Sequence, residues 1–331
     1  MVDQAEAAQH ELVAALSCLP LDVEGAVVHL SAAIRGFTES GDARRAGIAC
    51  ARLGDVYASF MGNRTAARAW YARADRHVAD LPSCVEQGWV AIASMGCEVD
   101  DPDVLLARAE LALSRAREFG DVDLEIKALA DSGLAHVETG RVGEGMALLD
   151  ESMALVISRQ CESPAGMTTL GQSVCSFFTA CYFSGDYERA EAWREPLRRN
   201  GLIGGVPGTP VFLSSHCDSI QAALLCELGR WHEAEAVLVR AIGEFESLMT
   251  APAWHPAVAL ADLRVRQGRL AEAEALLVGK DSSPQALLPA ARMHLARGEH
   301  ELARASARRG LRTMKNDCLR TIELLTVIVQ A

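Results

Sequence analysis

Two histidines and three cysteines are the residues of this chain best suited to chemistry. His216 or His255 could act as a general base, because the ordinary pKa of imidazole lies near neutrality. Imidazole and thiolate are also ligands for zinc and copper. His216, Cys217 and His255 could therefore bind a metal with Cys175 or Cys226. No pair of histidines stands four residues apart on one helix to anchor such a site, so we expect neither a metal nor a cofactor.

A short sequence frame recurs along the chain and must position these side chains. It is clearest at Gly229, which is followed by alanines five, seven and twelve residues later and by Leu238 nine residues later. Related frames begin at Leu21, Gly62, Pro102, Gly140, Gly185, Gly268 and Gly298. A repeat of about 40 residues is typical of a helical solenoid.

The spacing within the frame has a physical reason. Positions five, nine and twelve after the glycine share one face of a helix, and position seven points away from it. Small residues on both faces indicate a helix pressed between its own partner and the next repeat. The glycine suits the left-handed conformation that ends the preceding helix. We therefore predict an all-α fold, an α-solenoid of about eight tetratricopeptide-like helix-turn-helix repeats with a C-terminal closing helix.

The same frames divide the chain. We expect a single superhelix over residues 1–331, built from four parts. These are N-terminal repeats at 1–160, a longer central repeat at 161–217 with a glycine- and proline-rich loop at 200–210, C-terminal repeats at 218–314 and a closing helix at 315–331.

The composition limits the possible partners. The 331 residues are 50% hydrophobic but only 5% aromatic, and 32 Lys and Arg face 44 Asp and Glu, which gives a net charge of -12. An acidic chain is repelled by phosphates, so we expect no direct contact with nucleic acid. The basic stretch 292–320 is more typical of a solvated helix face. The uncharged stretch 163–185 is interrupted by polar residues, so we expect no membrane span.

The cysteines favour a reducing compartment. Ten are scattered along the chain without a Cys-x-x-Cys motif, mostly within apolar helical pattern, as buried free thiols are. The N-terminal residues lack the basic and apolar regions of a signal peptide. We therefore predict a cytoplasmic protein.

The middle of the chain also resembles a known family. Gly133, seven residues before Gly140, with Ala147 and Leu149 beyond, is similar to a tetratricopeptide repeat. The segments FGDVDLEIKALA, from position 119, and GRVGEGMALLDESM, from position 140, resemble the tetratricopeptide-like region of actinobacterial LuxR-type and MalT-like transcriptional regulators. The resemblance spans about residues 40–315. It implies a sensor and partner-binding arm, without the DNA-binding module and without the phosphate-binding motif of the regulators' ATPase.

That resemblance implies which side chains line the concave groove. In such repeats the inner helix presents positions six before, three before and one after a small residue, which lies seven before the turn glycine. Trp254 stands at the start of its helix and is expected at the rim. The predicted groove residues are Trp89, Lys127, Gln172, Cys175, Thr179, Tyr182, His216, Ser219, Cys226, Trp254, His255, Asp262 and Arg292. As an alternative, polar side chains of the 168–179 helix bond only to backbone carbonyls.

Three functions follow from this pattern. We favour a non-catalytic, regulatory scaffold or sensor whose groove binds a protein partner, a peptide or a small-molecule ligand. The alternative is a small-molecule enzyme of secondary metabolism that uses His216 or His255 as general base. A homodimer held by the apolar helix at 319–329 is the third possibility.

Overall fold

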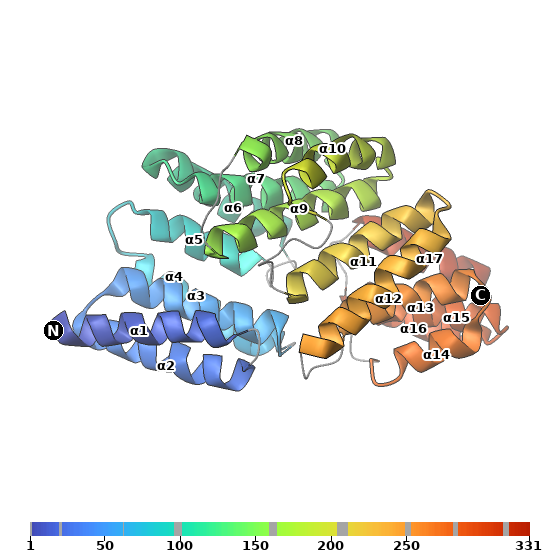
Figure 1. Cartoon of the computed structure of the whole chain (residues 1–331), viewed down its shortest axis with the longest axis horizontal. Coiled ribbons are helices and arrows are strands. Elements are labelled where there is room, and N and C mark those ends of the chain that lie inside the picture. The colour runs from blue at the N-terminus through green and yellow to red at the C-terminus, as the bar shows by residue number, and fades with distance from the viewer. Residues whose placement is uncertain are drawn as a thin grey trace. The chain divides into compact units, whose positions relative to one another are not determined.

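The computed structural model of the chain is an all-α solenoid of antiparallel helix pairs (Figure 1). It describes residues 2–19, 22–61, 63–95, 101–158, 164–203, 211–248, 253–280, 284–313 and 318–331. No β-strand occurs within these ranges. The predicted loop at 200–210 is described only as far as residue 203, and the rest of it lies outside the described residues.

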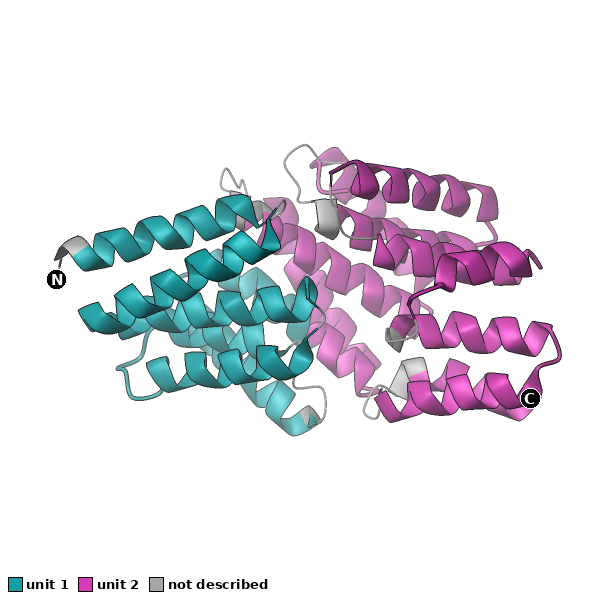
Figure 2. Ribbon diagram, turned by 90° about the horizontal axis from the view of Figure 1, so that it is seen from below, with its two compact units in different colours: residues 1–132 teal, residues 133–331 magenta. Residues whose placement is uncertain are grey.

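The chain divides into two compact units, which Figure 2 shows in different colours. The first unit is Met1–Ser132 and the second is Gly133–Ala331. The predicted divisions near residues 160, 217 and 314 stay predictions.

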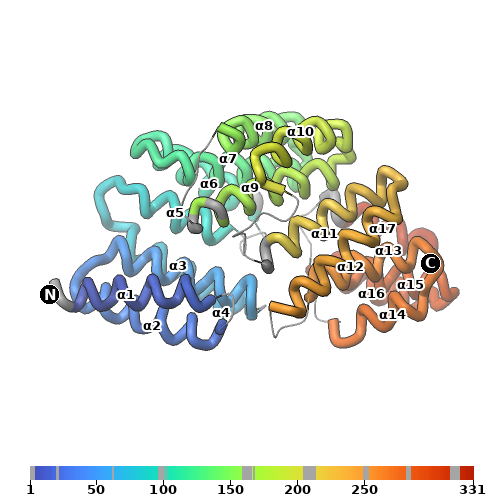
Figure 3. Tube along the Cα trace, in the orientation of Figure 1, coloured from blue at the N-terminus to red at the C-terminus, as the bar shows by residue number. Residues whose placement is uncertain are grey.

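Each unit is a succession of helix pairs, which the Cα trace follows in order (Figure 3). The first unit holds α1 (Val2–Cys18), α2 (Val23–Ser40), α3 (Ala43–Ser59), α4 (Arg64–Val78), α5 (Val85–Ser94), α6 (Pro102–Phe119) and the greater part of α7 (Val122–Glu138). The second unit holds the end of α7, α8 (Val142–Ser158), α9 (Pro164–Ser184), α10 (Tyr187–Arg199), α11 (Val211–Glu227), α12 (Trp231–Leu248), α13 (Trp254–Arg266), α14 (Leu270–Leu277), α15 (Leu287–Ala296), α16 (His300–Thr313) and α17 (Cys318–Gln330).

Glycine ends the first helix of the five pairs from α7–α8 to α15–α16, as predicted. Gly229, between α11 and α12, has a φ of 74°, in the left-handed region that other residues rarely adopt. The other frame glycines with positive φ are Gly140, Gly185, Gly268 and Gly298. Gly62 and Leu21 lie outside the described residues.

Several second helices pack between two first helices, also as predicted, and in the first unit α2 contacts α1 and α3, and α4 contacts α3 and α5. In the second unit α12 contacts α11 and α13, and α14 contacts α13 and α15. Ala234, Leu238 and Ala241 of α12 are buried on the face that makes these contacts. One part of the prediction was wrong, because Ala236, seven residues after the glycine, is exposed. One face of the helix therefore reaches both neighbours, and the alanine at position seven faces solvent.

The backbones of α7 and α8 approach each other very closely at two glycines. A Cβ built on Gly145 would lie 2.4 Å from the carbonyl oxygen of Gly133, and one built on Gly133 would lie 2.6 Å from Leu149 Cγ. Two backbones can come this near only when both residues lack a side chain. The tetratricopeptide-like spacing of these glycines therefore has a direct steric cause.

The last helix closes the stack. Leu324 and Val327 of α17 are buried against Ala303 and Ala307 of α16. The outward side of α17 carries exposed apolar residues, of which Val329 is the most open. Within the described residues, none of the helices combines the length and the apolar character that crossing a bilayer requires.

Candidate binding surface on the first helices of the second unit

The first helices of the second unit form a row. Along it α9 contacts α11, α11 contacts α13, α13 contacts α15, α15 contacts α17, and α17 also contacts α9. Side chains of these helices meet one another without an intervening second helix. We call this side the inner surface and define it by Cys175, Tyr182, His216, Cys217, Glu227, His255, Asp262, Arg266, Arg292 and Glu323.

A chain of ion pairs crosses four helices of the inner surface. Arg266 on α13 donates from Nη1 to Glu227 Oε1 on α11 over 2.6 Å, and from Nε to Asp262 Oδ2 over 3.0 Å. Arg292 on α15 donates to Asp262 Oδ1 over 2.7 Å and to Glu323 Oε1 on α17 over 2.8 Å. All five side chains are half-buried. Three carboxylates and two guanidinium groups leave the cluster with a net negative charge.

Both guanidinium groups of the cluster stay charged near neutral pH. Burial disfavours the charged form of both guanidinium groups, but the neighbouring carboxylates outweigh it. The pKa of Arg266, beside Asp262 and Glu227, and the pKa of Arg292, beside Asp262 and Glu323, therefore both lie above the ordinary value. At the edge of the cluster, burial and then the carboxylates of Glu323 and Asp262 raise the pKa of the Tyr182 phenol. Tyr182 consequently remains a neutral hydrogen-bonding group.

The two histidines that the sequence singled out lie together. The rings of His216 on α11 and His255 on α13 meet edge to face, with centroids 4.8 Å apart and planes at 71°. His255 is exposed, yet the surrounding protein removes enough water to lower the pKa of its imidazole. His255 is therefore neutral at pH 7. A role as general base stays a prediction.

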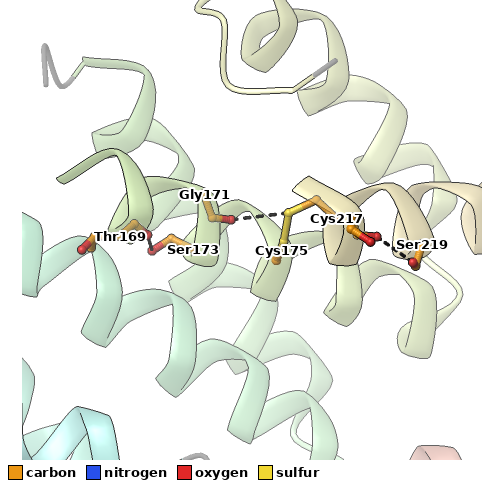
Figure 4. Close-up of a disulfide and its surroundings, with 7 residues drawn as sticks. Thr169, Gly171, Ser173, Cys175, Cys217 and Ser219 are labelled. Atoms are coloured by element: carbon orange, nitrogen blue, oxygen red, sulfur yellow. Dashed lines mark hydrogen bonds between the residues drawn. A yellow bond between two sulfur atoms is a disulfide. The ribbon is translucent and has the colours of Figure 1, made fainter. Parts of the chain in front are cut away.

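A disulfide joins α9 to α11 beside these histidines (Figure 4). It links Cys175 to Cys217, whose Cα atoms are 5.4 Å apart. The expectation of free thiols was wrong for this pair, because the facing sides of the two helices bring the cysteines within bonding distance. In the oxidised state neither sulfur is available as a metal ligand. Among the described residues, no group of three or more His, Cys, Asp or Glu is arranged to hold a metal ion.

Three other predicted groove residues are buried, as Cys175 is. Thr179, Ser219 and Cys226 are buried, so they do not face a partner in this conformation. The Ser219 hydroxyl donates to the carbonyl of Ser215 over 2.7 Å, and Ser173 on α9 bonds its own helix in the same way. The alternative for the 168–179 helix, that its polar side chains bond to backbone carbonyls, is thus confirmed for Ser173, and Ser219 on α11 behaves in the same way.

The remaining predicted residues lie in three places. Gln172 is half-buried on α9, and Trp254 is half-buried with Lys280 Nζ 5.8 Å from the centroid of its ring. Trp89 belongs to the first unit, where its Nε1 donates to Asp121 over 2.9 Å. Lys127, also in that unit, forms an ion pair with Asp131. The structure therefore assigns Trp89 and Lys127 to contacts within the first unit.

Sequence reasoning missed three members of the charged cluster. Glu227 and Arg266 each lie five residues after the small residue of their helix, Ala222 and Ala261. Extending the predicted groove positions by one further helical turn would have included both residues. Glu323 stands in the closing helix, to which the repeat frame does not extend, so no such signal marks it.

Comparisons with known proteins find similar solved structures but no matching family. No family model and no curated protein matches the chain. A tetratricopeptide repeat protein of known structure from Parabacteroides merdae ATCC 43184 is 15% identical, with 98% of this chain and 99% of that one covered and a TM-score of 0.32. The tetratricopeptide domain of P58(IPK) is 14% identical, with 98% of each chain covered and a TM-score of 0.29. These likenesses specify neither a partner nor a ligand, and the resemblance to LuxR-type and MalT-like regulators stays a prediction.

Proposed function

We propose that this chain is a non-catalytic, regulatory scaffold that binds a peptide or a segment of a protein partner along the inner surface of its second unit. The observation that carries the proposal is the chain of half-buried ion pairs from Glu227 to Glu323. It runs across three first helices, α11, α13 and α15, and the closing helix α17.

The energetics of charge support this interpretation. Charges taken out of water are costly, and well-packed apolar side chains of similar size often stabilise a fold as well or better. Arginine and tyrosine are enriched where proteins bind partners, since they offer large contact areas and directed hydrogen bonds. Arg266, Arg292 and Tyr182 supply both kinds of group on one surface.

The arrangement also indicates how a partner would be recognised. A peptide with its own charged side chains could replace one ion pair of the cluster by another without leaving a buried charge unpaired. Because the guanidinium groups keep their charge, we expect recognition to be electrostatic. Its affinity should therefore fall as the salt concentration rises.

A capture experiment with matched variants tests the proposal. The purified chain would be immobilised and incubated with an extract of its source, and each captured protein would then be purified and titrated against the chain by calorimetry. We expect Arg292→Ala to weaken the binding of a true partner by roughly tenfold or more, because a paired charge is left without its counterpart. The loss should be smaller at high salt.

The chain offers a close control for that variant. Arg297 comes directly after α15, the helix that carries Arg292, and its side chain has a similar exposure. It forms an ion pair with Glu274 of α14 over 2.7 Å, away from the inner surface. Arg297→Ala should bind the partner as the unaltered chain does. If both variants bind equally well while circular dichroism shows both to be folded, the inner surface is not the binding site.

A further inference from the structure

The four cysteines that the structure describes on α9 and α11 fall into two chemical kinds. Cys175 and Cys217 are bonded to each other, whereas Cys181 on α9 and Cys226 on α11 are free. All four lie on the same two helices. The difference between them is therefore set by their positions and not by the compartment in which the protein resides.

The free pair is poorly suited to oxidation. Burial raises the pKa of the Cys181 thiol far above its ordinary value and that of Cys226 to about 11. The thiolate is the form that reacts with oxidants, so both side chains are almost fully protonated and inert near neutral pH. Each is also enclosed by its neighbours.

The bonded pair differs from the free pair in the exposure of one member and in the short distance between its two helices. Cys217 is half-buried, so small reagents can reach it, while Cys175 is only 5% exposed and lies directly behind it. The Cα separation of 5.4 Å falls within the range of unstrained disulfides, so the bond forms without movement of either helix. An accessible thiol next to a resolving thiol is the arrangement of redox-responsive cysteines.

The reduced state has a partner of its own. The Sγ atom of Cys217 lies 3.8 Å from the carbonyl oxygen of Gly171 on α9 (Figure 4). A thiol at this position can donate a weak hydrogen bond to that oxygen, which a disulfide sulfur cannot do. Both oxidation states therefore keep a contact between α9 and α11, and only the oxidised one is covalent.

We propose that Cys175 and Cys217 are a reversible thiol–disulfide site that locks α9 to α11 on the inner surface. With a hydroperoxide as oxidant, the Cys217 thiolate attacks the peroxide oxygen and becomes a sulfenic acid, and the peroxide leaves as water or an alcohol. The Cys175 thiol then attacks the Cys217 sulfur and displaces the hydroxyl group as a second water. A dithiol reverses the reaction and becomes a disulfide itself.

The proposal is independent of the scaffold function, and its test is chemical. The intact protein would be reduced, freed of reductant, treated with hydrogen peroxide and alkylated with N-ethylmaleimide after denaturation. We expect two fewer labels per chain than before oxidation, and their return after native treatment with dithiothreitol. Chymotryptic cleavage at Phe177 and Phe178 separates Cys175 from Cys181 and lets mass spectrometry assign the cross-link.

Two variants sharpen the experiment. Cys175→Ser removes the resolving thiol, so the sulfenic acid should accumulate on Cys217 and be trapped by dimedone. The double variant Cys181→Ser and Cys226→Ser removes the inert pair and should oxidise as the unaltered protein does. A cross-link to another cysteine, no cross-link at all, or a Cys175–Cys217 bond that resists dithiothreitol in the folded protein would each overturn the proposal.

Hydrogen exchange provides a readout that does not depend on thiol reagents. Amides of α9 and α11 should exchange several-fold faster in the reduced protein than in the oxidised one, because the covalent link limits local opening. Amides of α1 to α4 should exchange at the same rate in both states. An unchanged rate in α9 and α11 would show that the bond does not lock the two helices.

Discussion

The first unit joins its helices through one large apolar cluster and separate ion pairs such as Arg108–Asp75, whereas the second unit links four helices through one chain of ion pairs and adds a disulfide. One apolar cluster, which includes Phe37, Leu53 and Val90, runs continuously from α1 to α5. From α11 to α17 in the second unit the apolar clusters are smaller, and each spans three successive helices. Between these clusters the first helices meet through Asp262, Arg266 and their partners.

This difference shows how one repeat frame can serve both structural support and recognition. Buried apolar area stabilises a stack without regard to direction, whereas hydrogen-bonded charges fix the register of helices and remain able to exchange partners. We therefore expect the first unit to act mainly as a stable support and the second unit to carry the recognition surface. The following substitutions test the contrast.

The largest effect is expected from the core of the first unit. Phe37 is fully buried, and Phe37→Ala should lower the free energy of unfolding by about 3 to 5 kcal/mol through lost burial and a remaining cavity. Urea titration followed by circular dichroism measures the change. The exposed Phe119 supplies the control, since Phe119→Ala should change stability by less than about 0.5 kcal/mol. Equal costs at the two positions would contradict a close-packed first unit.

Reduction of the disulfide should act on the second unit alone. The bond closes a loop between residues 42 apart, so its loss should cost about 2 to 4 kcal/mol of stability. The described cysteines of the first unit form no disulfide that a reductant could cleave; they are Cys18, Cys50 and Cys84. Urea titration with and without dithiothreitol gives the difference, and the Cys175→Ser variant should not respond to the reductant.

Two neighbouring glycines of α8 should respond in opposite directions. Gly145→Ala forces a Cβ against the backbone of Gly133 and should destabilise the protein by about 1 to 3 kcal/mol. Gly143→Ala meets no atom within 4 Å and should stabilise it by about 0.5 to 1 kcal/mol, because alanine is the better helix former. Thermal unfolding distinguishes the two. A loss of stability in both variants would show that the contact with Gly133 is not the cause.

The smallest effect concerns acid. Hydrogen bonds from Arg264 and then Gln267 lower the pKa of Glu235, on α12, from 4.5 to about 2. A lowered carboxyl pKa stabilises the fold above pH 4.5, and this contribution is lost as the pH falls toward 2. Solvent screens the pair, so we expect an effect on the order of 1 kcal/mol. Urea titrations between pH 6 and pH 3 should show a smaller loss for Glu235→Gln than for the unaltered protein.

Much of this fold could be predicted because its signals are local. The conformation of Gly229 depends on its own missing side chain, and the position of α17 follows from a short apolar run after the last repeat. The exposure of Ala236 could not be predicted in the same way. It depends on where the next helix crosses α12, and alanine suits both a solvent-exposed and a tightly packed helix face.

The inner surface was predicted in part for the same reason. The repeat frame gives His216 and His255 equivalent positions, and likewise Asp262 and Arg292. The members of each pair are in contact, because equivalent positions of successive first helices are neighbours. The disulfide could not be predicted in this way, since Cys175 and Cys217 are not at equivalent positions of their repeats. Their contact depends on the offset between α9 and α11, which no local pattern records.

The turn glycines have one more consequence, which concerns handedness. At Gly229 a Cβ would meet no atom within 4 Å, so space is not what excludes a side chain there. The positive φ of 74° is unfavourable for an L-amino acid by roughly 1 to 2 kcal/mol. A mirror-image residue such as D-alanine prefers this conformation and would also restrict the unfolded chain. Chemical synthesis could therefore make these repeats more stable than any ribosomal sequence allows at the same position.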